Sequence, residues 1–511
     1  ITAITSPTIE REAPAPQQSL TPNPNPSLPA PEQPPILELP DPTPVSSNED
    51  SISLQNEGSV LLQEEKITQP LTQELNPKEI TTSNGHIHYF NEASFQYLEE
   101  SFSQDYENYW HLPQAQPVTL ESVQATLKHA NNIYPTKSAL IYAVFIPQVL
   151  TQENTPDRFT LPRNNNAPHP DDQLLLILVS DTGNPIQLLS GVSRAEITQQ
   201  AKLFRLAVAD PNDPVSYRAL ARQMYSWLLS PLQPDLAEQK IDHVIYSLDQ
   251  GLRTIPLAAM MQDNTFAIEQ YGLSIIPSMG LTQLQPDNTV SKSRSLVAGA
   301  NQFSTLDDLP AVPIELDIIA NNLLTSDVLL NERFTLDNFL TVQTAKQPNL
   351  LHLATHAEFN AGSLEQSVIH FWNSSLTFNE MKELRWSDIE LLILSACDTA
   401  LSSPEAELGF TGLAAAAGIE TSMGSLWNVS DIGTLALMAE FYTQLPDTLL
   451  RSHSLQKAQI SMIHRETHIN SNSLKTSQSD VALPAGWDLP AIDFSHPFYW
   501  AGFTLVGNPW H

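Results

Sequence analysis

Two apolar segments, LLHLATHA at residues 350–357 and LLILSACDT at residues 391–399, determine how this chain folds. Each run is apolar on both faces, which is typical of a strand buried in a parallel sheet. Each ends in a side chain that can take part in catalysis, His356 in the first and Cys397 in the second. The intervening segment, about forty residues, is long enough for a crossover connection. Because parallel neighbours end at one edge of a sheet, we expect imidazole and thiol to lie within reach of each other.

The same rhythm of short apolar runs continues through the second half of the chain. Strands are predicted at residues 243–248, 273–278, 295–300, 328–331 and 421–427, and helices at 314–324, 335–345, 406–418 and 431–445. Ser430 is the expected N-cap of the last helix, and Pro446 marks its end. Strands that alternate with helices indicate an α/β sandwich with a mostly parallel central sheet. The run YWAGFTLVG, from Tyr499, is expected to close that sheet as its last strand.

Residues 1–85 differ from the rest in composition. Proline is dense from Pro14 to Pro44, as in TPNPNPSLPAPEQPP at residues 21–35. Because proline removes backbone donors and few apolar residues offset the entropy of ordering, we predict a disordered leader that acts as a spacer. A docking motif for a proline-binding module is the sharper alternative.

Beyond the leader we predict two parts. Residues 86–235 are read as an N-terminal α/β part, with strands that start at Ala139 and Gln173 and helices near 197–209 and 217–232. Residues 236–511 are read as the catalytic part. No clear short-period repeat is present.

Charge limits the partners of this protein. Its 511 residues include 57 acidic and 24 basic side chains, for a formal charge of -33. Such a surface repels phosphate backbones and anionic lipid, so nucleic acid and membrane surfaces are excluded as electrostatic partners. A cationic protein or peptide would be attracted. No apolar run reaches the roughly 18 residues expected of a membrane span.

Cysteine usage leaves the compartment open. Cys397 is the single cysteine, so no intramolecular disulfide can form, and neither the cytoplasm nor export is excluded. The chain begins with Ile1 rather than Met, so we expect its natural start to lie upstream, where a removed signal peptide would not be seen.

The chemistry of a thiol explains why the two segments matter together. A free thiol is mostly protonated at neutral pH, and an adjacent imidazole can take its proton and later return it to a leaving amine. The backbone N–H groups of Ala357 and Cys397 are the candidate donors to the oxyanion, because both are expected where backbone leaves the strand ladder. The plain alternative is that Cys397 is a small buried residue. Its uniqueness and the polar Asp398 that follows favour the catalytic interpretation.

His352 raises the question of a metal. His352 and His356 are four residues apart, the spacing of two zinc ligands on a helix. The flanking residues are strand-like and no Glu follows His352, so we predict no metal site and no cofactor, and a structural role for His352.

Several ordered motifs resemble the CHAT domain family, which is related to separases and is similar to caspases, and the likeness is greatest to its cyanobacterial members. The motifs are HLATHAEF (352–359), LLILSACDTAL (391–401), the segment 406–442, HPFYWAGFTLVGNPW (496–510), and upstream the segments 247–260, 268–282, 309–316 and 329–339. The resemblance runs from about Lys137 to His511. It implies a caspase-like three-layer sandwich with His356 and Cys397 as a His–Cys dyad. Many relatives carry Gly where this chain has Ala357, although the backbone N–H survives that change.

The resemblance also suggests a substrate pocket and a choice of functions. Relatives often bind a basic residue in an acidic pocket, for which Asp249 and Asp398 are the candidates. The alternatives are a turn formed by Asp249 with Gly251 and a merely solvated Asp398. We predict a cysteine endopeptidase acting on a protein or peptide substrate, active alone or after binding an activating protein partner. A catalytically silent CHAT adaptor that binds partner proteins is the alternative, which the intact His356 and Cys397 disfavour.

Overall fold

The computed structural model describes residues 91–510 except 148–167, 283–293, 324, 359, 361–363, 383, 385, 387, 399–403, 449, 471, 485–486 and 488–490. Within this part, the side chains of residues 396–398, 404–406, 410 and 447 are also outside the description. The predicted leader, residues 1–85, lies outside the described residues.

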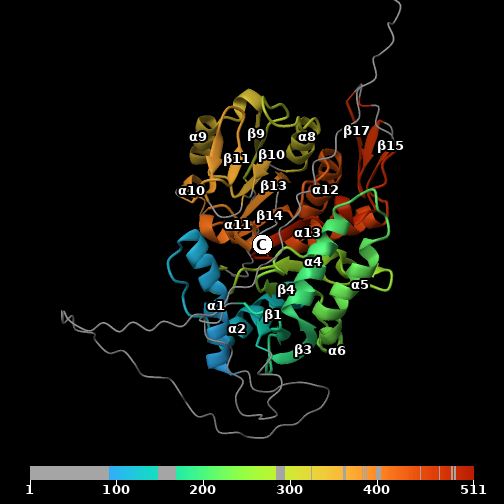
Figure 1. The fold of residues 1–511 in the computed structure, drawn as a ribbon. Helices are drawn as coiled ribbons and strands as arrows, with labels where there is room; N and C mark the ends of the chain where they lie inside the picture. The colour runs from blue at the N-terminus through green and yellow to red at the C-terminus, as the bar shows by residue number, and fades with distance from the viewer. Residues whose placement is uncertain are drawn as a thin grey trace, which may run out of the picture. The chain divides into compact units, whose positions relative to one another are not determined.

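One central sheet of 13 strands organises the described chain. Its main path is β12-β11-β10-β13-β14-β18-β7-β4-β1-β2-β3, and β8 joins β10 while β9 joins β8 (Figure 1). The strands are β1 Ser138–Ile146, β2 Gln173–Val179, β3 Ile186–Ser193, β4 His243–Leu248, β7 Gly272–Ile275, β8 Ser295–Gly299, β9 Ser326–Leu330, β10 Leu350–Glu358, β11 Val368–His370, β12 Ser375–Thr377, β13 Leu391–Asp398, β14 Thr421–Ser425 and β18 Phe503–Gly507. Strands from both predicted parts, 86–235 and 236–511, therefore share one sheet.

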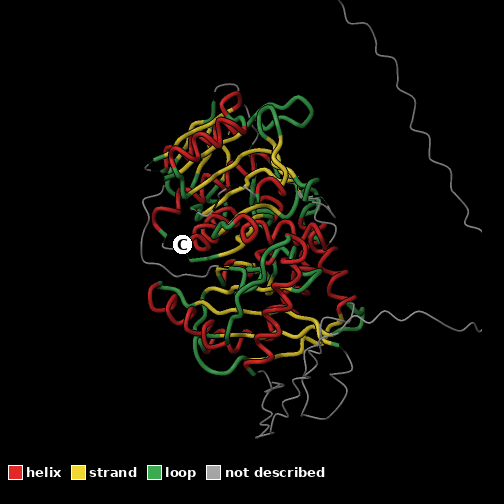
Figure 2. The backbone as a smooth tube through the Cα atoms, turned by 90° about the vertical axis from the view of Figure 1, so that its left-hand side faces the viewer, coloured by secondary structure: helices red, strands yellow, loops and turns green. Residues whose placement is uncertain are grey.

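Helices lie on both sides of this sheet, as the side view shows (Figure 2). They are α1 Glu92–Trp110, α2 Leu120–Ile133, α4 Arg194–Val208, α5 Tyr217–Leu228, α6 Gln233–Glu238, α7 Ala267–Gln270, α8 Val312–Asn322, α9 Leu336–Lys346, α10 Phe378–Met381, α11 Pro404–Ala417, α12 Asp431–Gln444 and α13 Arg451–Ile463. The predicted α/β sandwich with a mostly parallel central sheet is confirmed. No described helix is long and apolar enough to cross a bilayer.

Burial on both faces explains the uninterrupted apolar runs. In β1, Leu140 and Tyr142 belong to the cluster that packs under α1 and α2, whereas Ile141 and Ala143 belong to the cluster with α4 and α5. Because successive side chains of a strand point to opposite faces, a strand covered on both sides is expected to be apolar at most positions. The apolar runs from which strands are predicted are therefore explained by burial on both faces of the sheet.

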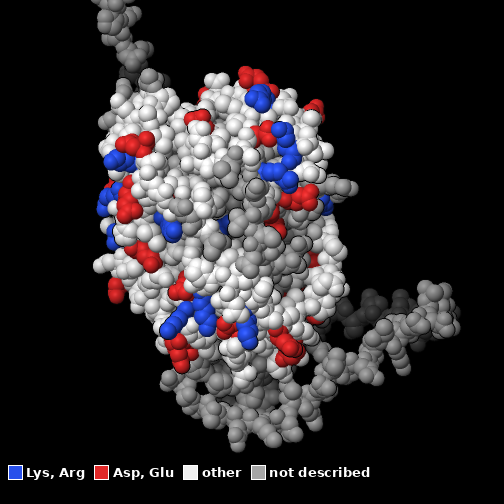
Figure 3. All heavy atoms as spheres, turned by 180° about the vertical axis from the view of Figure 1, so that it is seen from behind, with Lys and Arg blue, Asp and Glu red and all other residues white. Residues whose placement is uncertain are grey.

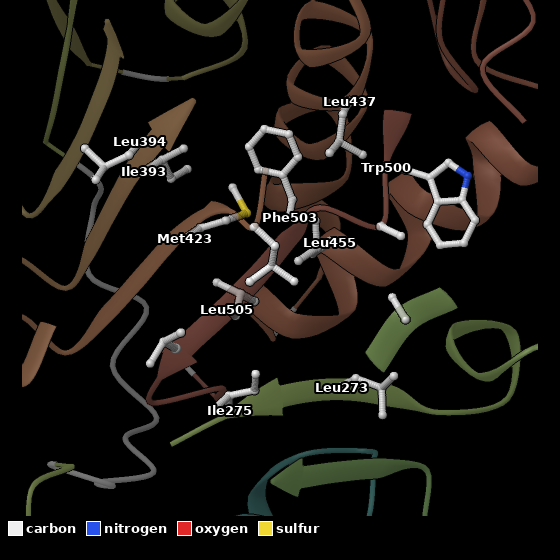
Figure 4. Packing of buried hydrophobic residues seen from close by; sticks show 14 of the residues in the cluster. Leu273, Ile275, Ile393, Leu394, Met423, Leu437, Leu455, Trp500, Phe503 and Leu505 are labelled. Atoms are coloured by element: carbon white, nitrogen blue, oxygen red, sulfur yellow. The ribbon is translucent and has the colours of Figure 1, made fainter. Parts of the chain in front are cut away.

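The last strand occupies a place that the sequence did not predict. The run from Tyr499 forms β18, but β18 lies inside the sheet, antiparallel to β14 and parallel to β7. The expectation that it closes the sheet is therefore wrong. Figure 4 shows Phe503 and Leu505 of β18 packed with Met423 of β14, and Ile275 of β7 nearby. These buried side chains pack β18 against β14 on one side and lie near β7 on the other, so β18 connects the strands on its two sides into one sheet.

The two groups of strands run in opposite directions. β9, β8, β10, β13 and β14 are mutually parallel, and so are β18, β7, β4 and β1. Because β14 and β18 pair antiparallel, the carboxyl ends of the first group and of the second group lie at opposite edges of the sheet. A site at the ends of β10 and β13 therefore belongs to one group alone.

The predicted helix from residue 431 begins and ends as its sequence indicates. The Ser430 hydroxyl accepts the N–H of Gly433 at 3.2 Å, as an N-cap does. The α-helix ends at Gln444, and a short 3₁₀ turn over Leu445–Asp447 contains Pro446.

Charge on the surface is mixed in sign where it can be followed. On the face shown in Figure 3, acidic and basic side chains lie interspersed among neutral ones. The excess of acid therefore does not form one single-sign patch on this face.

Gly507, at the end of β18, has a backbone that another residue cannot adopt without strain. Its φ is +114°, and a Cβ would lie 2.2 Å from the Glu420 carbonyl oxygen. We expect Gly507→Ala to lower the free energy of unfolding by about 3 kcal/mol or more, because both overpacking and strain apply. Urea unfolding measures this loss.

Gly418 supplies the matched control. Its φ is also positive, +72°, but nothing lies within 4 Å of a Cβ built there. Gly418→Ala should therefore cost only the conformational term of about 1–2 kcal/mol. Equal losses in the two variants would contradict the close packing of β18 against β14.

Candidate active site

The site begins with the pairing of β10 and β13. These strands are parallel neighbours, with Leu350 beside Leu391 at the start and Ala357 beside Cys397 near the end. Leu351, Leu353, Leu392 and similar aliphatic side chains are buried on both faces and fix this pairing. The pairing that the two sequence segments require is thus present, and both strands end at the same edge of the sheet.

The register near the ends is staggered by one residue. His356 stands beside Ala396, and Cys397 stands beside Ala357, after a register shift in β10 between Leu353 and His356. Residues directly opposite each other share a face of a regular sheet, so regular pleating would turn His356 and Cys397 to opposite faces. For the two to form a dyad, the backbone near the end of β13 must depart from regular pleating, so that the Cys397 thiol reaches the face on which His356 lies. The side chain of Cys397 lies outside the described part.

The imidazole of His356 is held by the loop that follows β8, residues 301–311. Its Nε2 lies 2.8 Å from the carbonyl oxygen of Asp307, and the ring of Phe303 meets it edge-on at a centroid distance of 4.8 Å. A carbonyl oxygen only accepts, so this contact places the proton on Nε2. In the neutral ring Nδ1 is then the basic nitrogen, and no described residue makes a hydrogen bond with it.

The predicted oxyanion donors lie side by side in this pairing. Ala357 and Cys397 are register partners, and each is the last residue but one of its strand. Strand pairing thus continues one residue past both, to Glu358 and Asp398, so neither N–H is beyond the ladder as the sequence suggested. Their backbones are nevertheless adjacent, near the same edge of the sheet.

His352 lies four residues earlier, in the buried part of β10. Its Nε2 lies 2.8 Å from Oε1 of Glu315 on α8, and its Nδ1 lies 3.2 Å from the hydroxyl of Tyr442 on α12. All three side chains are buried. Both ring nitrogens of His352 are therefore engaged by protein groups, and these two contacts connect β10 to the two helices that cover it.

Asp431, at the first turn of α12, lies at the edge of the same buried cluster. Its Oδ2 accepts the backbone N–H of Ala311, the N-cap residue of α8, at 2.7 Å. Burial raises the pKa of Asp431 to about 7, the hydrogen bond from Ala311 opposes the rise, and the nearby Glu315 adds to it. This carboxylate is therefore unusually costly to ionise at neutral pH.

Asp249, a predicted pocket residue, is engaged elsewhere. It follows β4, which belongs to the group of strands that runs opposite to β10 and β13. Its Oδ2 accepts the N–H of Phe145 at 3.0 Å and lies 3.3 Å from Arg194, while its Oδ1 accepts the N–H of Gln250 at 2.6 Å. These contacts favour the turn role over the substrate role.

Asp398, the other predicted pocket residue, is placed by its backbone. It is the register partner of Glu358, two residues beyond His356. The Glu358 carboxylate lies 2.9 Å from Nε2 of His370 on β11. The Asp398 side chain lies outside the described part.

Sequence reasoning missed three residues of this neighbourhood. Glu358 could have been found, because it continues the strand that carries His356. Asp307 contacts His356 through a backbone carbonyl, and Asp431 acts on a helix end, so no side-chain pattern announces either contact.

The fold and the site together define a class: an α/β sandwich in which a histidine and a cysteine lie near the ends of two neighbouring parallel strands. The CHAT domain family model matches residues 218–508, more than half of the chain. The chain therefore belongs to the CHAT domain family, as its motifs predicted. Among curated proteins, none matches the sequence significantly.

Solved structures show distant likenesses, with 35 matching chains. A chain of the Saccharomyces cerevisiae separase–securin complex is 12% identical, with a TM-score of 0.44 over 77% of this chain and 31% of that one. The Arg specific cysteine proteinase gingipain R is 11% identical, with a TM-score of 0.33 over 62% of this chain and 74% of that one. This chain thus spans about a third of the length of the separase-complex chain.

The raised pKa of Asp431 has a consequence for stability. Between pH 4 and pH 7 the folded chain keeps a proton that the unfolded chain has lost, so this group lowers stability as pH rises through that window, and the whole penalty applies above it. Asp431→Asn carries no charge and keeps an oxygen acceptor for Ala311. We expect its free energy of unfolding to match wild type near pH 4 and to exceed it by roughly 2–4 kcal/mol at pH 8.

Urea unfolding at the two pH values measures the difference. Asp337→Asn is the control, because Asp337 is an exposed acid in the first turn of α9. A gap between wild type and Asp431→Asn that stays constant from pH 4 to pH 8 would contradict the burial of the Asp431 charge.

Proposed function

We propose that this chain is a cysteine endopeptidase in which Cys397 attacks the peptide carbonyl and His356 is the general base. The observation that carries the proposal is the parallel pairing that sets Cys397 beside Ala357, next to a His356 already held by Asp307. Membership of the CHAT domain family supports it. A cyanobacterial origin stays a prediction.

The tautomer of His356 suits this role. With Nε2–H donated to Asp307, Nδ1 can accept the thiol proton, and the resulting imidazolium is stabilised by the same carbonyl. The thiolate then forms a bond to the carbonyl carbon, and the proton returns from Nδ1 to the leaving amine. Water completes the cycle by hydrolysing the thioester, which frees the thiol and the acid product.

Charge on the tetrahedral intermediate needs donors. We assign this role to the N–H groups of Ala357 and Cys397, whose backbones are adjacent. For the substrate pocket we keep Asp398, beside Glu358, as the group that would attract a basic side chain. A protein partner that activates the enzyme also stays part of the proposal.

Cys397 is the only cysteine, so thiol alkylation reports on this one site. An isolated thiol, with a pKa near 8.5, is only about 1% ionised at pH 6.5, whereas a thiol paired with imidazole is ionised to a much larger extent. We expect iodoacetamide to alkylate the wild-type chain at pH 6.5 at least about tenfold faster than it alkylates His356→Ala. His468→Ala, which removes a half-buried histidine on β15 (His468–Asn470), should alkylate like wild type.

Cleavage of a peptide library tests the activity itself. Wild type is expected to cut peptides and Cys397→Ala to cut none, and the assay is repeated in cell lysate to supply an activating partner. Equal alkylation of wild type and His356→Ala, together with equal cleavage by wild type and Cys397→Ala, would reject the protease and leave the adaptor.

A further inference from the structure

The 301–311 loop has a defined conformation, which several hydrogen bonds hold in place. The Leu309 N–H bonds to the Asn301 carbonyl at 3.0 Å, and the Asn301 N–H bonds to Oδ1 of Asn331 at 3.0 Å. The Phe303 N–H is 3.3 Å from Oδ1 of Asp308. These bonds close the loop on itself and fix its start beside β9.

The other end of this loop is fixed from α12. The N-cap of α8, Ala311, has no side chain with which to cap the helix, and its own buried N–H would be left without a partner. Asp431 supplies that partner at 2.7 Å. Loss of this acceptor would leave a buried backbone donor without a partner.

The loop also bears the groups that hold the imidazole. Asp307 contributes the carbonyl that accepts from Nε2 of His356, and Phe303 covers the ring edge-on. Only three residues lie between Asp307 and Ala311. A shift of the α8 end would therefore move the acceptor of His356.

Buried hydrogen bonds join α8 and α12 to β10. Glu315 of α8 and Tyr442 of α12 both contact His352, which precedes His356 on the same strand. The strand is thus already attached to the two helices. Where the loop joins α8, the backbone N–H of Ala311 is held by the Asp431 side chain.

We propose that Asp431 is a positioning residue for His356, which fixes the end of the 301–311 loop at Ala311 and so the carbonyl of Asp307 against Nε2. This inference rests on the proposed function, because it concerns the same base. Asp431 acts through the loop and does not touch the reacting atoms.

The test uses the full-length chain and five variants, each checked for folding by circular dichroism. At pH 7, Asp431→Ala and Asp431→Ser should lower the rate of Cys397 alkylation by iodoacetamide on the order of tenfold, since displacement of a catalytic group by about 1 Å costs that much or more. At pH 10 the rate should equal wild type, because any thiol is then ionised. On a cleaved peptide, kcat should fall with KM within about twofold.

A variant that restores the hydrogen bond distinguishes loss of that bond from general disruption of the fold. Asp431→Asn should recover most of the pH 7 rate, because its amide oxygen can accept from Ala311. Asp337→Ala, at the exposed first turn of α9, should leave the rate unchanged. Serine is tolerated in the first turn of a helix, so Asp431→Ser keeps the test valid if the alanine variant does not fold.

Two results would overturn the inference. One is a folded Asp431→Ala or Asp431→Ser chain that alkylates at the wild-type rate at pH 7 while His356→Ala is slowed. The other is a folded Asp431→Asn chain that is as slow as Asp431→Ala. If His356→Ala itself alkylates like wild type, the dyad of the proposed function fails instead, which is a separate outcome.

Discussion

The parallel pairing of β10 with β13 is the constraint on which the site depends. Two strands that run in the same direction end at the same edge, and only this arrangement sets the backbone of Cys397 beside that of Ala357. Burial on both faces fixes the pairing, since a slip in register would displace every aliphatic contact along it.

The residues around these two strands hold them, and the His356 side chain, in place. His352, Glu315 and Tyr442 join β10 to α8 and α12 inside the core. Asp307 and Phe303 approach His356 from the loop before α8. The same two helices therefore contact both the strand that carries His356 and the loop that holds its imidazole.

Much of this could be predicted from the sequence. The strands at residues 350–357 and 391–399 can be predicted because a strand that is buried on both faces is apolar at most positions. The central place of β18 was not, because an apolar run does not say whether its neighbours are parallel or antiparallel. The sequence does not readily predict α1, although Phe95, Leu98, Phe102 and Tyr106 repeat at helical spacing, because polar residues between them dominate its composition. Asp307 and Asp431 lay beyond sequence reasoning, since each acts through a backbone group brought near by tertiary packing.

The distance from Sγ of Cys397 to Nδ1 of His356 tests the central claim most directly. A crystal structure of the chain in its reduced form would give it. We predict a separation of roughly 3–4 Å, with Nε2 still on the Asp307 carbonyl. A sulfur turned to the opposite face of the sheet, with the body of β13 between it and the imidazole, would contradict the account.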